Sequence, residues 1–446
     1  MKATPDPLLT LRNWSLVRRV PGGENTVLDH IDLDIRPGQW LAVLGANGSG
    51  KSSLLKYLAS DESPLADSAS IMFQDPDEQI FAASVDREIS LGRPEVETGS
   101  ILGEFGLADL DQMDPRLLSA GQKQRLVLAV AMASGPRVLL CDEPTALQDT
   151  GQTLWVLDRL EGWLREAGGA LVTATCDRLE AARSDWLVVL ADGRIIRQGS
   201  TAELLDSPEV DELLGSGLNN PPSLVRHTET ERPALLELRG LGCRFSGPGS
   251  GFSNVNLGVG AGERVGITGL NGCGKSTLLS ACAGMRRPDQ GSVSLNRRML
   301  YVRKDREVDH GIAMIAPQFP EYMFTSSTVR QEIRLDPNLA SREAGEFLVS
   351  LGLSESLADR NPHDLSSGQR RRLALGMVLW SKRPVLLLDE PTAALDRKGR
   401  NLVLEMLDQV SAGTALVIAS HDREFLEAAG CRVLALGPGG LTPAGG

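Results

Sequence analysis

Short apolar runs that lead into glycine-rich or acidic segments recur along the chain and predict its buried strands. WLAVL at 40–44 precedes GANGSGKSSLL, and RVGIT at 264–268 precedes GLNGCGKSTLL. Each stretch predicts a strand, a glycine-rich loop and a helix that begins near Lys51 or Lys275. RVLLCDE and PVLLLDE end in paired acids, as expected of buried strands that bring carboxylates to the edge of a sheet. The pattern is typical of an α/β fold.

Four blocks of sequence recur in the same order, which predicts a duplicated domain. The pairs are 45–52 with 269–276, 118–132 with 365–379, 137–149 with 384–396, and 171–182 with 416–429. A chain of 446 residues is also long enough for two cores. We predict domains over 1–214 and 234–446, joined by a linker at 215–233 that contains Gly, Asn and Pro.

The two copies differ in one spacing. Lys51 and Gln74 are 23 residues apart, whereas Lys275 and Gln318 are 43 apart. In the second copy the additional 20 residues include GSVSL at 291–295, whose alternation predicts a strand of a peripheral sheet. We therefore predict a trimmed β-subdomain in the first copy.

Composition excludes several classes of protein. The chain is 41% hydrophobic and 23% charged, no apolar run approaches the roughly 20 residues of a membrane span, and MKATPDP is not a signal peptide. A net charge of −12 argues against a nucleic-acid-binding protein. The six cysteines lack CxxC spacing, so neither a zinc site nor a disulfide framework is predicted, and a reducing cytosolic compartment is expected.

The glycine-rich loops predict nucleotide binding. Their backbone N–H groups face phosphate oxygens, Lys51 and Lys275 reach the terminal phosphates, and Ser52 and Ser276 offer hydroxyls to Mg²⁺. The predicted nucleotide contacts in the loops are Gly45, Asn47, Gly48, Gly50, Lys51, Ser52, Ser53, Gly269, Asn271, Gly272, Gly274, Lys275, Ser276 and Thr277.

The paired acids predict the hydrolytic chemistry. Asp142 and Asp389 would hold Mg²⁺. Glu143 and Glu390 would orient and polarise the water that attacks the γ-phosphate.

LSAGQ at 118–122, LSSGQ at 365–369, DEPTALQD and DEPTAALD resemble the signature and Walker B motifs of ABC-type ATPases, and the resemblance covers nearly the whole chain twice. It implies two tandem P-loop domains, each a RecA-like core with a helical and an antiparallel β subdomain, that pair head to tail within the chain. Each ATP would lie between the phosphate loop of one domain and the signature of the other. The resemblance adds the nucleotide contacts Ser119, Gly121, Gln122, Ser366, Gly368 and Gln369, and the metal-site residues Gln74 and Gln318.

The family also implies an aromatic residue against adenine and a histidine beside the γ-phosphate. Phe245 fits the aromatic position in the second copy, whereas the first has Arg18, whose guanidinium could also stack on adenine. His421 is the expected histidine, and Cys176 replaces it in the first copy. A reactive thiol is one interpretation of Cys176, but we favour a degenerate first site that binds ATP and hydrolyses it slowly.

FQDPDEQIF at 73–81 and PQFPEYMF at 317–324 resemble the ATPases of energy-coupling factor importers. That resemblance implies an integral-membrane scaffold subunit, a separate membrane subunit that captures substrate, and a peripheral position at the cytoplasmic face of the membrane. Residues 75–81 and 319–324 would face the scaffold, and the apolar side chains Ile80, Phe81, Tyr322, Met323 and Phe324 favour an interface there. The cargo would be a vitamin or related micronutrient, or a transition-metal ion. A ribosome-acting tandem ABC protein and a fused sugar-importer ATPase are the alternatives.

Overall fold

The chain forms two compact units, Met1–Ser216 and Gly217–Gly446. The computed structural model describes residues 6–20, 23–93, 95–146, 148, 150–214, 234–244, 251–300, 312–393, 395 and 397–444. The predicted linker at 215–233 and Phe245 lie outside these residues. None of the described helices has the length and hydropathy needed to cross a membrane.

A six-stranded sheet in the order β4-β5-β6-β3-β7-β8 forms the centre of the first unit. The first five strands in this order are parallel and β8 is antiparallel to β7, because β8 returns from β7 by a tight turn. The strands are β3 (Trp40–Leu44), β4 (Ala69–Met72), β5 (Val138–Asp142), β6 (Ala170–Thr175), β7 (Trp186–Ala191) and β8 (Arg194–Ser200). Every residue of β3, β5 and β6 is buried, as their apolar runs predict.

The second unit repeats this sheet in the order β14-β15-β16-β11-β17-β18. Its strands are β11 (Arg264–Thr268), β14 (Ala313–Ala316), β15 (Val385–Asp389), β16 (Ala415–Ala419), β17 (Arg432–Gly437) and β18 (Gly440–Pro443). The shared strand order confirms the predicted duplication of an α/β domain.

The antiparallel strands differ between the units. Within the described residues of the first unit, β1 (Leu9–Val20) and β2 (Gly23–Ile35) form a two-stranded sheet, whereas the second unit has a four-stranded sheet in the order β10-β9-β12-β13. Its strands are β9 (Ala234–Arg244), β10 (Gly251–Gly260), β12 (Gln290–Leu295) and β13 (Arg298–Met299). Strand β12 contains the predicted GSVSL strand, so the trimmed β-subdomain of the first unit is confirmed.

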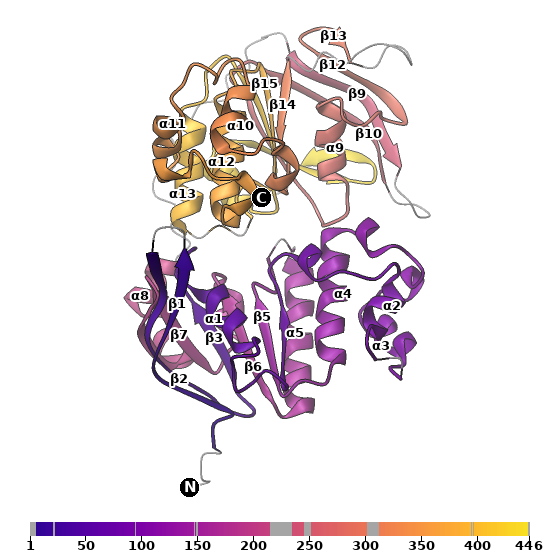
Figure 1. Ribbon diagram of the computed structural model, residues 1–446. Helices are drawn as coiled ribbons and strands as arrows, with labels where there is room; N and C mark the ends of the chain where they lie inside the picture. The colour runs from indigo at the N-terminus through magenta and orange to yellow at the C-terminus, as the bar shows by residue number, and fades with distance from the viewer. Residues whose placement is uncertain are drawn as a thin grey trace. The chain divides into compact units, whose positions relative to one another are not determined.

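Helices cover the central sheets, and in each unit a helical group lies at the end opposite the antiparallel strands (Figure 1). The helices of the first unit are α1 (Lys51–Leu58), α2 (Val85–Ser90), α3 (Thr98–Glu104), α4 (Ala120–Ala133), α5 (Thr150–Ala167), α6 (Arg178–Ala181), α7 (Thr201–Leu204) and α8 (Pro208–Leu214). Those of the second are α9 (Lys275–Cys282), α10 (Val329–Leu335), α11 (Ala344–Ser350), α12 (Ser367–Leu379), α13 (Arg397–Asp408) and α14 (Arg423–Ala428).

Candidate nucleotide sites

The first phosphate loop connects β3 to α1 and closes around its own lysine. Gly50, the N-cap of α1, has φ 106°, so the backbone conformation favours glycine, and a Cβ there would lie 2.7 Å from Leu28 Cδ2 and displace that side chain. Lys51 Nζ donates to Gly45 O at 2.7 Å and to Ala46 O at 3.2 Å. The ammonium group thus lies inside the turn whose N–H groups and helix N-terminus suit an anion.

The second phosphate loop, between β11 and α9, has the same N-cap conformation. Gly274 repeats the φ of 106° at the N-cap, and Lys275 Nζ donates to Gly269 O at 2.8 Å. Lys275 Nζ also lies 3.8 Å from Glu390 Oε1, which links the loop to the acidic end of β15. The structure places all the predicted loop residues in these two turns and the helix starts that follow them.

Asp142 and Asp389 end β5 and β15 with nearly inaccessible side chains. Burial raises the pKa of Asp142, against the Ser52 hydrogen bond and the charge of Lys51. Burial likewise raises the pKa of Asp389 to about 6, against the Ser276 hydrogen bond. In both aspartates Oδ1 is buried and has no hydrogen-bond partner in the described part of the chain. A buried acceptor oxygen beside a serine hydroxyl suits Mg²⁺, so these residues fit the predicted metal sites.

The glutamates that follow these aspartates have an unusual backbone conformation. Glu143 has φ 50° and Glu390 has φ 47°, in the left-handed region. Each backbone N–H donates to the end of the neighbouring strand, Glu143 to Ala174 O and Glu390 to Ala419 O, both at 2.8 Å. These bonds fix the turn after the acidic strand, so the conformation is the same in both units.

The partners of the two glutamate carboxylates differ. In the second unit, Glu390 Oε2 lies 2.9 Å from His421 Nδ1 and accepts from Ser420 Oγ at 3.1 Å. Burial acts to raise the pKa of Glu390, but the hydrogen bond from His421 and the charges of His421 and Lys275 lower it below its ordinary value. The carboxylate is therefore ionised, as a group that polarises water requires.

In the first unit Glu143 Oε2 accepts from Gln74 Nε2 at 3.1 Å. Cys176 directly follows β6 at the position that corresponds to His421, and its side chain is half-buried. The structure therefore brings Gln74 to Glu143 in the first unit and His421 to Glu390 in the second. Gln318 instead accepts from Arg371 Nη2 at 3.0 Å through its backbone carbonyl.

The signature serines are the N-cap residues of α4 and α12. Ser119 and Ser366 each form a capping box with the glutamine three residues later, Gln122 and Gln369. The glycines Gly121 and Gly368 lie in the first helical turn. Helix N-capping is thus one role of each signature, and each presents a helix N-terminus at its surface.

Sequence reasoning missed several residues that hold the site. Glu88 Oε2 accepts from Phe81 N at 2.9 Å and Glu332 Oε2 from Thr325 N at 2.9 Å, so a buried glutamate fixes the loop after each predicted glutamine. The V-x-x-E pattern shared by 85–88 and 329–332 is the signal that could have found them. Gln124 was also missed; its Nε2 donates to Pro144 O at 2.7 Å.

The prediction that five apolar loop residues form a surface is wrong for Phe324, which is 5% exposed and belongs to the hydrophobic core. Ile80 and Met323 also pack against core residues. Phe81 and Tyr322 are 75% and 70% exposed, so an apolar surface remains on each loop. Arg18, the predicted alternative adenine contact, is exposed on β1, and Trp14 stacks on Tyr57 with centroids 4.0 Å apart.

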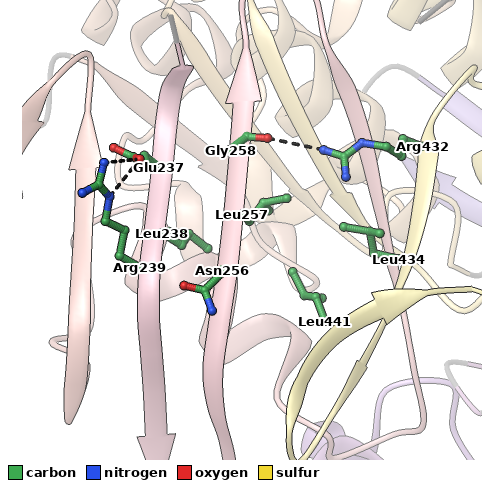
Figure 2. A pocket seen from close by; sticks show the side chains of 9 residues that line it. All are labelled: Glu237, Leu238, Arg239, Asn256, Leu257, Gly258, Arg432, Leu434 and Leu441. Carbon is green, nitrogen blue, oxygen red and sulfur yellow. Dashed lines mark hydrogen bonds and ion pairs between the residues drawn. The ribbon is translucent and has the colours of Figure 1, made fainter. Parts of the chain in front are cut away.

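A groove in the second unit is separate from the phosphate loop. It has a volume of about 530 Å³ and lies between β9, β10 and the β17–β18 hairpin, with Leu257, Leu434 and Leu441 on its walls (Figure 2). In the first unit Arg194 on β8 forms an ion pair with Asp29 on β2. The residues at these two positions in the second unit are Gly440 and Ser253, which cannot form that pair. The groove shares no residue with the predicted nucleotide site.

Comparison with known proteins agrees with this geometry. The family model described as "ABC transporter" matches residues 28–146 and 252–393. "Putative ABC transporter ATP-binding protein" of Bifidobacterium longum is 27% identical over 92% of this chain, which spans 63% of that protein's length. "Putative HMP/thiamine import ATP-binding protein YkoD" of Bacillus subtilis is 27% identical over 98% of this chain and 91% of its own length.

Two solved structures share the fold. "RNase-L Inhibitor" has a TM-score of 0.60 at 20% identity and covers 93% of this chain and 88% of its own. A ribosome-bound archaeal complex of Pelota and ABCE1 has a TM-score of 0.68 at 21% identity over 92% of this chain and 75% of its own. At these identities the similarity shows the tandem fold alone.

Proposed function

The chain belongs to the ABC transporter family of Mg²⁺-dependent ATPases, and on that premise we propose that it is the ATP-hydrolysing subunit of an importer of the energy-coupling factor type. The observation that carries the proposal is an exposed aromatic side chain, Phe81 or Tyr322, on the loop after each predicted glutamine. A buried glutamate on the adjacent helix hydrogen-bonds to each of these loops, so a displacement of the loop by a partner is transmitted to the rest of the unit.

In each unit, different residues perform the separate tasks of phosphoryl transfer. Lys51 and Lys275 bind the phosphates, and Asp142 and Asp389 would hold Mg²⁺, which neutralises phosphate charge when bound. Glu390, ionised and held by His421, orients the attacking water in the second unit, and Glu143 has the same place in the first.

The two sites are proposed to be composite and unequal. The phosphate loop of each unit would be completed by the signature of the other, 365–369 for the first and 118–122 for the second. The Lys275, Glu390 and His421 site is the fast one, because its carboxylate has an imidazole partner and Glu143 has an amide instead. An amide does not carry the positive charge with which a protonated imidazole stabilises the developing negative charge.

The partners proposed for this subunit are an integral-membrane scaffold and a separate membrane subunit that captures substrate, with this chain peripheral at the cytoplasmic face. The name of the Bacillus subtilis relative, a thiamine-related import protein, supports a vitamin or related micronutrient as cargo. A transition-metal ion is the alternative cargo. The net charge of −12 argues against nucleic acid as a partner.

Co-purification tests the proposal. The tagged chain, expressed with its neighbouring genes and extracted in mild detergent, should retain an integral-membrane subunit. Phe81→Ser and Tyr322→Ser should each reduce the recovery of that subunit, whereas Leu117→Ser, which changes an equally exposed apolar residue elsewhere in the first unit, should not. Recovery of ribosomal particles in place of a membrane protein would refute the importer and support a ribosome-acting ATPase.

A further inference from the structure

A buried carboxyl group that the hydrolytic mechanism does not use lies behind the first nucleotide site. Glu180 is on α6, four residues after Cys176, and its side chain is fully buried. Thr145 Oγ1, two residues beyond Glu143, donates to Glu180 Oε2 at 2.8 Å. We propose that Glu180 is a positioning residue of the first site, which holds segments 143–145 and 175–177 in place for ATP binding. This inference rests on ATP binding by the first unit and not on the transport role.

The same carboxyl lies beside β6, which contacts two further segments of the first unit. The hydroxyls of Thr173 and Thr175 on β6 face it and act to lower its pKa. Trp40 Nε1 donates to Thr173 Oγ1 at 3.1 Å, and Trp40 begins β3, the strand that leads into the phosphate loop. Asp177 N donates to Thr175 Oγ1 at 3.0 Å and so fixes the backbone around Cys176. Glu180 is therefore bonded to segment 143–145 and packs beside β6, the strand that contacts both the start of β3 and the backbone around Cys176.

The second unit fills the same space with hydrocarbon. Phe425 stands four residues after His421, where the first unit has Glu180, and Ile418 stands in place of Thr173. Both are fully buried members of the hydrophobic core. The second unit therefore forms the same fold without a carboxyl group at this position. Because a buried carboxyl costs stability relative to well-packed apolar side chains, its presence in one unit points to a role in that unit's site.

The surroundings of Glu180 favour its neutral form. Thr145 faces it from the turn after β5, and Thr173 and Thr175 face it from β6. The titratable groups that interact with it are Asp177 at the start of its own helix and Cys141 on β5, and neither offsets a negative charge. Burial, with Asp177, raises the pKa of Glu180 to about 8 against the three hydroxyls. Its Oε1 is buried and has no hydrogen-bond partner in the described ranges, so ionisation leaves an unsolvated charge there.

Calorimetric titration with Mg-ATP across pH 7–9.5 tests this role in the full chain carrying Lys275→Ala, which disables the second phosphate loop. The affinity should be constant near pH 7 and about tenfold weaker at pH 9, one pH unit above the pKa. At pH 9 binding should take up about one proton, measured in buffers of different ionisation enthalpy. Adding Glu180→Gln should abolish both effects, whereas Glu166→Gln, at an exposed glutamate of the same unit, should leave them unchanged.

Three results would overturn the inference. The first is that the Lys275→Ala chain with Glu180→Gln loses affinity at alkaline pH and takes up a proton just as the Lys275→Ala chain alone does. The second is pH-independent ATP binding by the Lys275→Ala chain, which would refute the role of Glu180 but not ATP binding by the first unit. The third is absence of ATP binding at every pH, which would overturn that binding as well. If Glu180→Gln does not fold, Thr145→Ser should preserve affinity at pH 7 and Thr145→Val should weaken it, and equal affinities would refute the role of Thr145.

Discussion

Removal of the His421 imidazole should slow ATP hydrolysis by the second unit without unfolding it. The imidazole Nδ1 lies 2.9 Å from Glu390 Oε2. A hydrogen bond to a charged group contributes about 1.5–3 kcal/mol, which corresponds to roughly 10- to 150-fold in rate when the contact is needed only in the transition state. Ser420 Oγ still donates to the carboxylate at 3.1 Å, so His421→Ala should leave the buried charge with a partner and the fold intact.

Phosphate release by the full chain at saturating Mg-ATP measures this effect, with ATP affinity and melting temperature measured in parallel. His30→Ala, at an exposed histidine of the first unit, is the control and should keep the parent's rate within about twofold. Turnover by His421→Ala within threefold of the parent would refute the reasoning. So would a higher KM with an unchanged kcat, because that result assigns the imidazole to ground-state binding.

Four further predictions follow from the same geometry. Cys176→His should raise turnover of the Lys275→Ala chain, and an unchanged rate would mean that the missing imidazole does not limit the first site. Glu180→Gln should be more stable than the parent, by a margin that grows with pH. The folded-state pKa of about 8 exceeds the ordinary value of 4.5, so the parent's stability is full below pH 4.5 and falls by about 1.4 kcal/mol per pH unit up to pH 8. Urea denaturation between pH 6 and 8 should show the stability difference between Glu180→Gln and the parent growing with that slope. Gly50→Ala should abolish ATP binding by the first unit, because alanine disfavours φ 106° and its Cβ meets Leu28, and normal affinity would contradict the strain. Ser119→Ala should cost about 1 kcal/mol through the lost cap of α4, seen as a melting temperature lower by about 2–4 °C, whereas Ser119→Asp should keep the cap.

The duplication and the chemistry of the phosphate loops were readable from the sequence because both depend on local patterns. An apolar run, a glycine at a left-handed position and a lysine at a helix start are local requirements, and they recur at Gly50 and Gly274 with the same φ. The strand at 291–295 followed from alternation in the same way. The exposed loop surface was only partly predictable, since the sequence does not show that Phe324 turns inward and Phe81 outward.

Equivalent positions also carry different residues that make comparable contacts. Gln124 on α4 donates to Pro144 O, and Arg371 on α12 donates to Glu390 O at 2.6 Å, so an amide and a guanidinium both hold the turn after the acidic strand. The signature blocks show that these positions correspond, but the contacts appear only when the helix is packed against the turn.

The sequence by itself determined two α/β units, their phosphate loops, their acidic strand ends and the replacement of His421 by Cys176. The tertiary structure alone decided that Gln74 contacts Glu143 whereas His421 contacts Glu390, and that Glu180 is buried among three threonines. The physical reason is that motif chemistry is set by neighbours in the chain. The protonation and orientation of a side chain depend instead on burial and on groups brought from distant strands.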